Sequence, residues 1–204
     1  MFAAPMPSAI ATPDQSPANR LTERDAAYAG LMSASSGERN DHLFARILAS
    51  WQVGVSVLPA RLGLSPAVYR ALFDRHFPGL QWAENETGRD ELDDERLPER
   101  DDLIHLMMDA RAGRDESELW MAEIVATACI GMDHLWQDLG LWSRKELSEL
   151  MQHNFPPLAA RNDRDMKWKK FLYKQLCEQE GIYVCRAPSC DVCGDYLVCF
   201  GPEE

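Results

Sequence analysis

The chain has 204 residues, of which 46% are hydrophobic, and its net charge is −12. This length fits one domain, or one domain with a small appendage, and the hydrophobic content is enough to bury a core. A strongly acidic chain repels a phosphate backbone, so nucleic acid is excluded as the main partner. No apolar run reaches the roughly 18 residues of a membrane span. Because residues 1–11 also lack a basic residue ahead of an apolar stretch, we expect a cytoplasmic protein without a secretory signal or membrane attachment.

The first 19 residues are rich in Ala, Pro and Ser and show no periodic pattern. This composition predicts a disordered N-terminal tail over residues 1–19. Helical periodicity begins at Leu21 and predicts a helical domain over residues 20–180. Thr22 is the expected cap of its first helix, which should end near Ser33.

Two further helices are predicted in the N-terminal half. The first should follow Asn40 and Asp41. Its apolar residues recur on one side at helical spacing and are Leu43, Phe44, Ile47, Leu48 and Trp51. Ser65 and Pro66 predict the start of the second, because the hydroxyl caps a free N–H and proline costs nothing at the first helical position. This helix should end before Pro78.

The segment 83–100 is densely acidic and has few apolar residues, so we expect an exposed loop that tolerates substitution. The helix after it should close at Gly113. The longest helix should then run from about Asp115 to about Asp138, with Gly140 as its stop. Its apolar stripe comprises Trp120, Ile124, Ala128, Met132, Leu135, Trp136 and Leu139.

Ser143 and Glu146 have the spacing of a capping box and predict another helix start. That helix should reach about Asn154, where the pair of prolines at 156–157 ends it. His153 lies in its last turn and is expected to place positive charge at the C-terminal end of the helix dipole.

The last predicted helix should be capped by Asn162 or Asp163 and reach about Glu180. No segment shows the alternation of apolar and polar residues that is typical of a strand. We therefore expect an all-α, bundle-like fold of about six or seven helices. Residues 181–204 should form an irregular, cysteine-rich metal-binding segment.

Four of the six cysteines form a terminal motif with the spacing C-x4-C-x2-C-x5-C. They are Cys185, Cys190, Cys193 and Cys199. Thiolates are soft ligands, and four of them select an iron–sulfur cluster, zinc or copper(I) over hard ions. A tight terminal cluster without a secretory signal indicates metal ligands more than a disulfide framework.

The spacing favours iron–sulfur and leaves two alternatives. Structural zinc sites usually pair two short C-x2-4-C knuckles across a longer insert, whereas here there is one C-x2-C pair and a short final gap. The opening C-x4-C-x2-C is also the start of the plant-type ferredoxin spacing. The alternatives are a zinc-stapled helical interaction protein and a redox or disulfide use of the same cysteines.

Two residues outside the motif are further candidate metal ligands. Cys177 precedes the motif by a short stretch, and His134 lies beside Asp133 and Trp136. Each also has a structural interpretation: Cys177 as a small apolar residue on a helix, and His134 as a packed polar residue near a helix end. Cys129 lies among apolar neighbours and should belong to the core.

A basic stretch leads into the cysteine motif although the chain as a whole is acidic. Its cations are Arg161, Arg164, Lys167, Lys169, Lys170 and Lys174. They either offset thiolate charge and attract an oxyanion such as molybdate, or form an ordinary solvated helix face.

Several blocks of the C-terminal half match a known pattern. They are residues 131–141 (GMDHLWQDLGL), 154–158 (NFPPL), 166–171 (MKWKKF), 176–178 (LCE) and the cysteine motif with its ending Cys199-Phe-Gly. With these blocks the chain resembles the NifQ family of nitrogen-fixation proteins. The resemblance is strong over residues 120–201 and weaker over 40–80.

The resemblance implies a role in molybdenum delivery. NifQ-like proteins carry an iron–sulfur cluster, of three or four irons, that takes up molybdenum from molybdate or another donor. They are thought to pass it to the proteins that assemble the iron–molybdenum cofactor of nitrogenase. The family's motif maps onto Cys185, Cys190, Cys193 and Cys199. We therefore expect a metallochaperone and not an enzyme, and the sequence has no G-x-S-x-G, phosphate-binding loop or H-E-x-x-H motif.

Overall fold

A computed structural model describes residues 17–80, 97–181 and 196–203, and all regular structure in these ranges is helical. The all-α class is therefore confirmed for the described residues. The helices are α1 (Pro17–Ser33), α2 (Asp41–Gln52), the 3-10 helix η1 (Ala60–Gly63), α3 (Pro66–His76), α4 (Leu97–Asp109), α5 (Ser117–Cys129), α6 (Leu135–Leu139), α7 (Arg144–Asn154), α8 (Pro156–Arg161), α9 (Trp168–Gln179) and α10 (Tyr196–Phe200).

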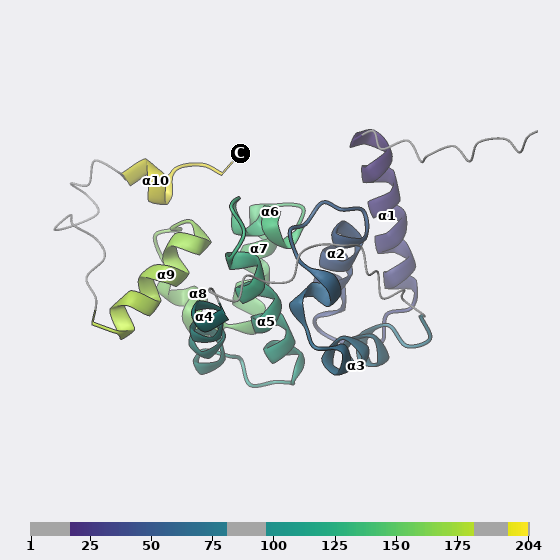
Figure 1. Cartoon of the computed structure of the whole chain (residues 1–204), viewed down its shortest axis with the longest axis horizontal. Helices are drawn as coiled ribbons and strands as arrows, with labels where there is room; N and C mark the ends of the chain where they lie inside the picture. The colour runs from purple at the N-terminus through teal and green to yellow at the C-terminus, as the bar shows by residue number, and fades with distance from the viewer. Residues whose placement is uncertain (1–16, 81–96, 182–195, 204) are drawn as a thin grey trace, which may run out of the picture.

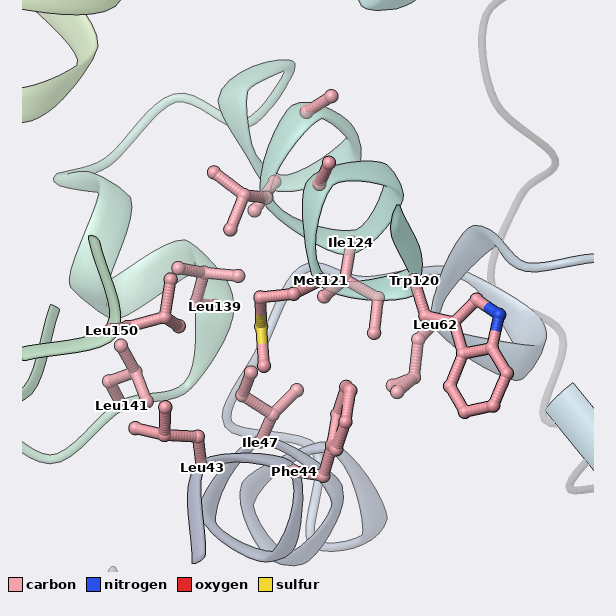
Figure 2. Close-up of a cluster of buried hydrophobic side chains, with 14 of the residues drawn as sticks. Leu43, Phe44, Ile47, Leu62, Trp120, Met121, Ile124, Leu139, Leu141 and Leu150 are labelled. Carbon is pink, nitrogen blue, oxygen red and sulfur yellow. The ribbon is translucent and has the colours of Figure 1, made fainter. Parts of the chain in front are cut away.

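Helix α5 is the centre of the bundle. It lies between the N-terminal helices α1–α3 and the C-terminal helices α8–α10 (Figure 1), and it packs against α4 and α6. Below it, Leu43, Phe44 and Ile47 of α2 point toward Met121 and Ile124 (Figure 2), and all five side chains are fully buried. Burial of such apolar surface is the main favourable term that holds the helices together.

The predicted caps of α3 and α7 are confirmed. The Ser65 hydroxyl accepts the Val68 N–H at 3.3 Å. The Ser143 hydroxyl accepts the Glu146 N–H, also at 3.3 Å, and the Glu146 carboxylate accepts the Trp142 N–H at 2.7 Å. These contacts satisfy N–H groups that have no partner within the first turn of a helix.

The single long helix predicted over this central region is wrong, because α5 ends at Cys129 and α6 begins at Leu135. The break centres on Gly131. A Cβ there would lie 2.4 Å from Oδ2 of Asp138, so the backbone passes directly over the carboxylate of the next helix. Met132, which the predicted stripe placed in the core, is 95% exposed.

The proline pair was expected only to end α7, which does stop at Asn154. It also begins α8, with Pro156 at its first position. A proline is tolerated there because the first N–H groups of a helix have no partner within it.

Helix α9 begins at Trp168, several residues after the predicted caps Asn162 and Asp163. Asn162 instead holds a loop. Its side chain accepts the Met166 N–H at 2.8 Å and donates to the Met166 carbonyl at 2.9 Å. The helix then ends at Gln179, close to the predicted end.

Two helix starts and one additional helix also differ from prediction. Helix α1 begins at Pro17, and Thr22 lies inside it with its hydroxyl donating to the Ala18 carbonyl at 3.1 Å. Helix α4 begins at Leu97, within the expected acidic loop, and α10 lies within the segment expected to be irregular. The rest of the predicted tail and acidic loop lies outside the described residues.

Candidate metal centre

The described residues include one member of the cysteine motif. Cys199 lies in α10 and is half-buried, whereas Cys185, Cys190 and Cys193 lie outside the described residues. Within the described ranges, no three or more His, Cys, Asp or Glu side chains are grouped so that they could hold a metal ion. The predicted four-thiolate site therefore stays a prediction.

Cys199 is attached to the helical body through its backbone. Its carbonyl accepts the N–H of Lys167, the residue before α9, at 2.8 Å. The next side chain, Phe200, lies under the Arg164 guanidinium at 5.6 Å from the ring centroid. Gly201 closes the helix tightly, because a Cβ there would lie 2.4 Å from the Leu197 carbonyl oxygen. Cys199 and Phe200 thus attach α10 to the residues that precede α9.

His134, one of the further candidate ligands, is the residue that precedes α6. Its backbone N–H donates to the Gln137 side chain at 3.3 Å, and its Nδ1 lies 3.6 Å from Oε1 of Glu203. The side chain therefore faces the C-terminal residues that follow α10. The structure brings His134 toward that end of the chain.

Cys177 and Cys129 occupy different environments. Cys177 is half-buried on α9, and its role as a metal ligand stays a prediction. Cys129 is 2% exposed within the core, which confirms its predicted structural role.

Much of the predicted basic stretch is used within the fold. The half-buried Lys169 forms an ion pair with the buried Asp138 of α6, and its ammonium also donates to the Gly131 carbonyl at 2.9 Å. Lys174 pairs with Glu178 at 3.5 Å. Arg161 and Lys170 remain exposed on α8 and α9. Lys169 and Lys174 of the basic stretch therefore pair with carboxylates of the fold, and Arg161 and Lys170 contribute to an exposed basic surface.

Asp138 is a buried carboxylate at the centre of the packing within residues 131–141. Its side chain is 1% exposed, and burial raises the pKa of its carboxyl group while the Lys169 ammonium acts against that rise. Gly131 lets the backbone pass over this carboxylate, and Gly140 ends α6 in the left-handed conformation with φ 77°. The Asp138–Lys169 pair was not predicted from the sequence, although Gly131 and Gly140 on either side of α6 are a signal of close backbone packing.

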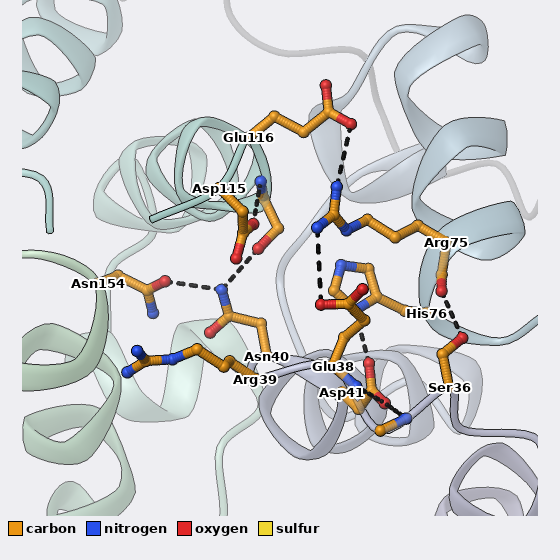
Figure 3. Close-up of polar contacts among 12 residues, drawn as sticks. Ser36, Glu38, Arg39, Asn40, Asp41, Arg75, His76, Asp115, Glu116 and Asn154 are labelled. Atoms are coloured by element: carbon orange, nitrogen blue, oxygen red, sulfur yellow. Dashed lines mark hydrogen bonds and ion pairs between the residues drawn. The ribbon is translucent and has the colours of Figure 1, made fainter. Parts of the chain in front are cut away.

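His76 and His153 have structural partners. His76 is buried beside Asp41, with 2.6 Å between Nδ1 and Oδ1 (Figure 3), and burial lowers its pKa despite that carboxylate. His153 contacts Arg39, with Nε of Arg39 donating to Nε2 at 3.2 Å. Burial, followed by the charge of Arg39, lowers the pKa of His153. His153 does lie in the last turn of α7, but its lowered pKa acts against the positive charge expected there.

A cleft of about 400 Å³ opens beside α6. Its walls include Arg24, Asp133, Trp136, Gln137 and Trp142. Separately, none of the described helices is long and apolar enough to cross a membrane.

The sequence of the chain matches a family model and several named proteins. The NifQ family model matches residues 43–201. A protein named NifQ from Azotobacter vinelandii is 49% identical over 177 residues, covering 81% of this chain and 91% of its own length. NifQ proteins of Rhodobacter capsulatus and Klebsiella pneumoniae are 40% and 38% identical and are covered over 87% and 95% of their lengths. No solved structure matches the chain.

Proposed function

The chain belongs to the NifQ family, and on that premise we propose that it is a carrier of an iron–sulfur cluster that binds molybdenum and donates it for assembly of the nitrogenase cofactor. The family is linked to nitrogen fixation. The observation that carries the finer proposal is the four-cysteine motif, whose last member Cys199 is fastened to the helical body.

The donor chemistry fits such a cargo. Four thiolates bind iron and sulfide clusters and exclude hard ions. Thiolate-bound clusters carry negative charge, and the Arg164 guanidinium lies 5.6 Å from the centroid of the Phe200 ring in α10. A cation at this end of the chain favours a negatively charged cargo.

The arrangement also suits release of the cargo. The fully buried apolar core lies in α2, α5 and the helices around them, and Cys199 and Phe200 pack against it as partly buried side chains. A carrier needs a core separate from its cargo site, because a site that also supplies the folding energy cannot be emptied without unfolding the protein. The protein is accordingly proposed to act by binding and transfer, and not as an enzyme.

The proposed partners follow from the same chemistry. Molybdate or another molybdenum donor loads the cluster, and a protein of the nitrogenase cofactor assembly machinery receives the metal. We place both steps in the cytoplasm, where thiolates stay reduced.

Metal analysis of anaerobically purified protein tests this proposal. We expect a brown protein with visible absorption, with iron and acid-labile sulfide in a fixed ratio and with molybdenum after incubation with molybdate. Cys190→Ala should lose the colour, and Cys129→Ala is the matched control, since that cysteine lies in the core. A colourless protein with one zinc per chain would instead support the zinc-stapled interaction protein.

A further inference from the structure

Hydrogen bonds fix the conformation of the loop between α8 and α9. Asp165 has a positive φ of 54°, which is uncommon for a residue with a side chain. Such a conformation persists where its surroundings fix it. Here the Asn162 side chain makes two hydrogen bonds to the Met166 peptide groups, one as acceptor and one as donor. The end of this loop presents the Lys167 N–H to the Cys199 carbonyl.

Arg144, the first residue of α7, joins this loop to the end of the chain. Its Nη2 donates to the Asp165 carbonyl at 2.9 Å and to the Asp165 carboxylate at 2.7 Å. Its Nη1 lies 2.9 Å from Oε1 of Glu203. A planar guanidinium can hold two such acceptors at a fixed angle, which an ammonium cannot do.

Glu203 is buried although it lies close to the end of the chain. Its side chain is 3% exposed, and besides Arg144 it faces Nδ1 of His134 at 3.6 Å. A buried carboxylate needs such partners, because an unpaired charge away from water is costly. The contact therefore fixes the residues after α10 on the body, as Lys167 fixes the end of α10 itself.

We propose that Arg144 and Glu203 form a clasp that positions Cys199, the last ligand of the metal segment, on the helical body. The inference rests on the proposed function. The clasp holds the backbone on the C-terminal side of Cys199, so that this thiolate keeps its place whether or not cargo is bound. Arg144 and Glu203 are positioning residues in this account, and His134 contributes by facing Glu203.

Iron retention tests the clasp. The full-length chain and its variants Glu203→Gln, Arg144→Met and Arg144→Lys are reconstituted anaerobically with iron and sulfide, and iron loss to a ferrous chelator is timed. We expect the first two variants to lose iron about tenfold faster, because each removes a charge-assisted contact. Arg144→Lys should lose iron at a rate between that of the parent and that of these two variants, since an ammonium does not reproduce the two hydrogen bonds that a guanidinium makes at a fixed angle.

A second readout does not involve metal. In the apo-protein, hydrogen exchange of the Lys167 amide reports on its bond to Cys199 and should accelerate in Glu203→Gln and Arg144→Met. Far-ultraviolet circular dichroism should stay that of the parent. Arg161→Met, which removes an exposed guanidinium on α8 outside the clasp, is the matched control and should behave as the parent in both readouts.

The outcomes separate this inference from the proposed function. If the parent takes up iron and the clasp variants release it at the parent's rate, the clasp does not position the metal segment, whatever the amide exchange shows. If the parent takes up no iron under the same conditions, the proposed function itself fails.

Discussion

The buried carboxylate of Asp138 and the half-buried ammonium of Lys169 form an ion pair that joins α6 to α9. The same ammonium holds the Gly131 carbonyl at the break between α5 and α6. One cation therefore ties three segments together, and this places the C-terminal helices relative to the core.

Removal of Lys169 should be strongly destabilising. Lys169→Met leaves the Asp138 carboxylate buried without its partner, and we expect a loss of about 3 kcal/mol in the free energy of unfolding. Urea unfolding measures it. Lys170→Met is the control, because that side chain is exposed and its loss should change stability by less than about 0.5 kcal/mol. Equal effects of the two substitutions would contradict the structural role of the pair.

Gly131→Ala should also destabilise the protein, because its Cβ would collide with the Asp138 carboxylate at 2.4 Å. We expect a cost of about 2 kcal/mol, as for other insertions into a packed region. Gly30→Ala provides the opposite control. Nothing lies within 4 Å of a Cβ at this exposed position of α1, so that variant should gain about 0.5 to 1 kcal/mol. Thermal unfolding of both variants compares the signs directly.

Stability should fall as the pH is lowered through the range in which histidine titrates. Burial lowers the pKa of His76 below its ordinary value of 6.5, so the unfolded chain binds this proton more readily than the folded chain. The free energy of unfolding should thus be lost progressively as the pH falls below about 6.5. Urea unfolding between pH 8 and pH 5.5 measures the slope.

Two variants test whether His76 causes this pH dependence of the free energy of unfolding. His76→Gln should flatten it in part, since His153 titrates in the same direction and remains. His105→Gln, at an exposed position, should keep the slope of the parent. A parent that gains stability on acidification over this range would contradict the assignment.

Local chemistry explains which features the sequence predicted well. The starts of α3 and α7 were predicted because Ser65 and Ser143 each bond to an N–H three residues away, and such contacts depend only on neighbours in the chain. The break at Gly131 was missed because its cause is a carboxylate on the next helix and a lysine on α9. Periodicity alone continues a helix across such a point.

The same difference between local and long-range contacts decides which parts of the candidate site could be predicted. The thiolate motif was recognised from spacing, since its members lie close in sequence. The attachment of this motif to the helical body was not predicted. Arg144 and Glu203 come together only through the packing of α7, the loop before α9 and the end of the chain. Nothing in the local sequence around Glu203 marks it as buried.

The helical body should not depend on the metal. Cys190→Ala is expected to keep the parent's far-ultraviolet circular dichroism and most of its thermal stability, since the core lies in helices that precede the motif. Structural zinc sites behave differently, because their metal supplies on the order of 10 kcal/mol to folding. Global unfolding of Cys190→Ala or of the apo-protein would mark the site as a structural staple.

The most direct test of the carrier function is molybdenum transfer. The protein, reconstituted with iron, sulfide and molybdate, is mixed with cofactor-assembly proteins that lack molybdenum, and the metal on each partner is measured after separation. We predict that molybdenum moves to the acceptor while the donor chain stays folded, and that Cys190→Ala delivers none. Molybdenum that never binds the parent chain, or that binds and stays on it in the presence of the acceptor, would contradict the account.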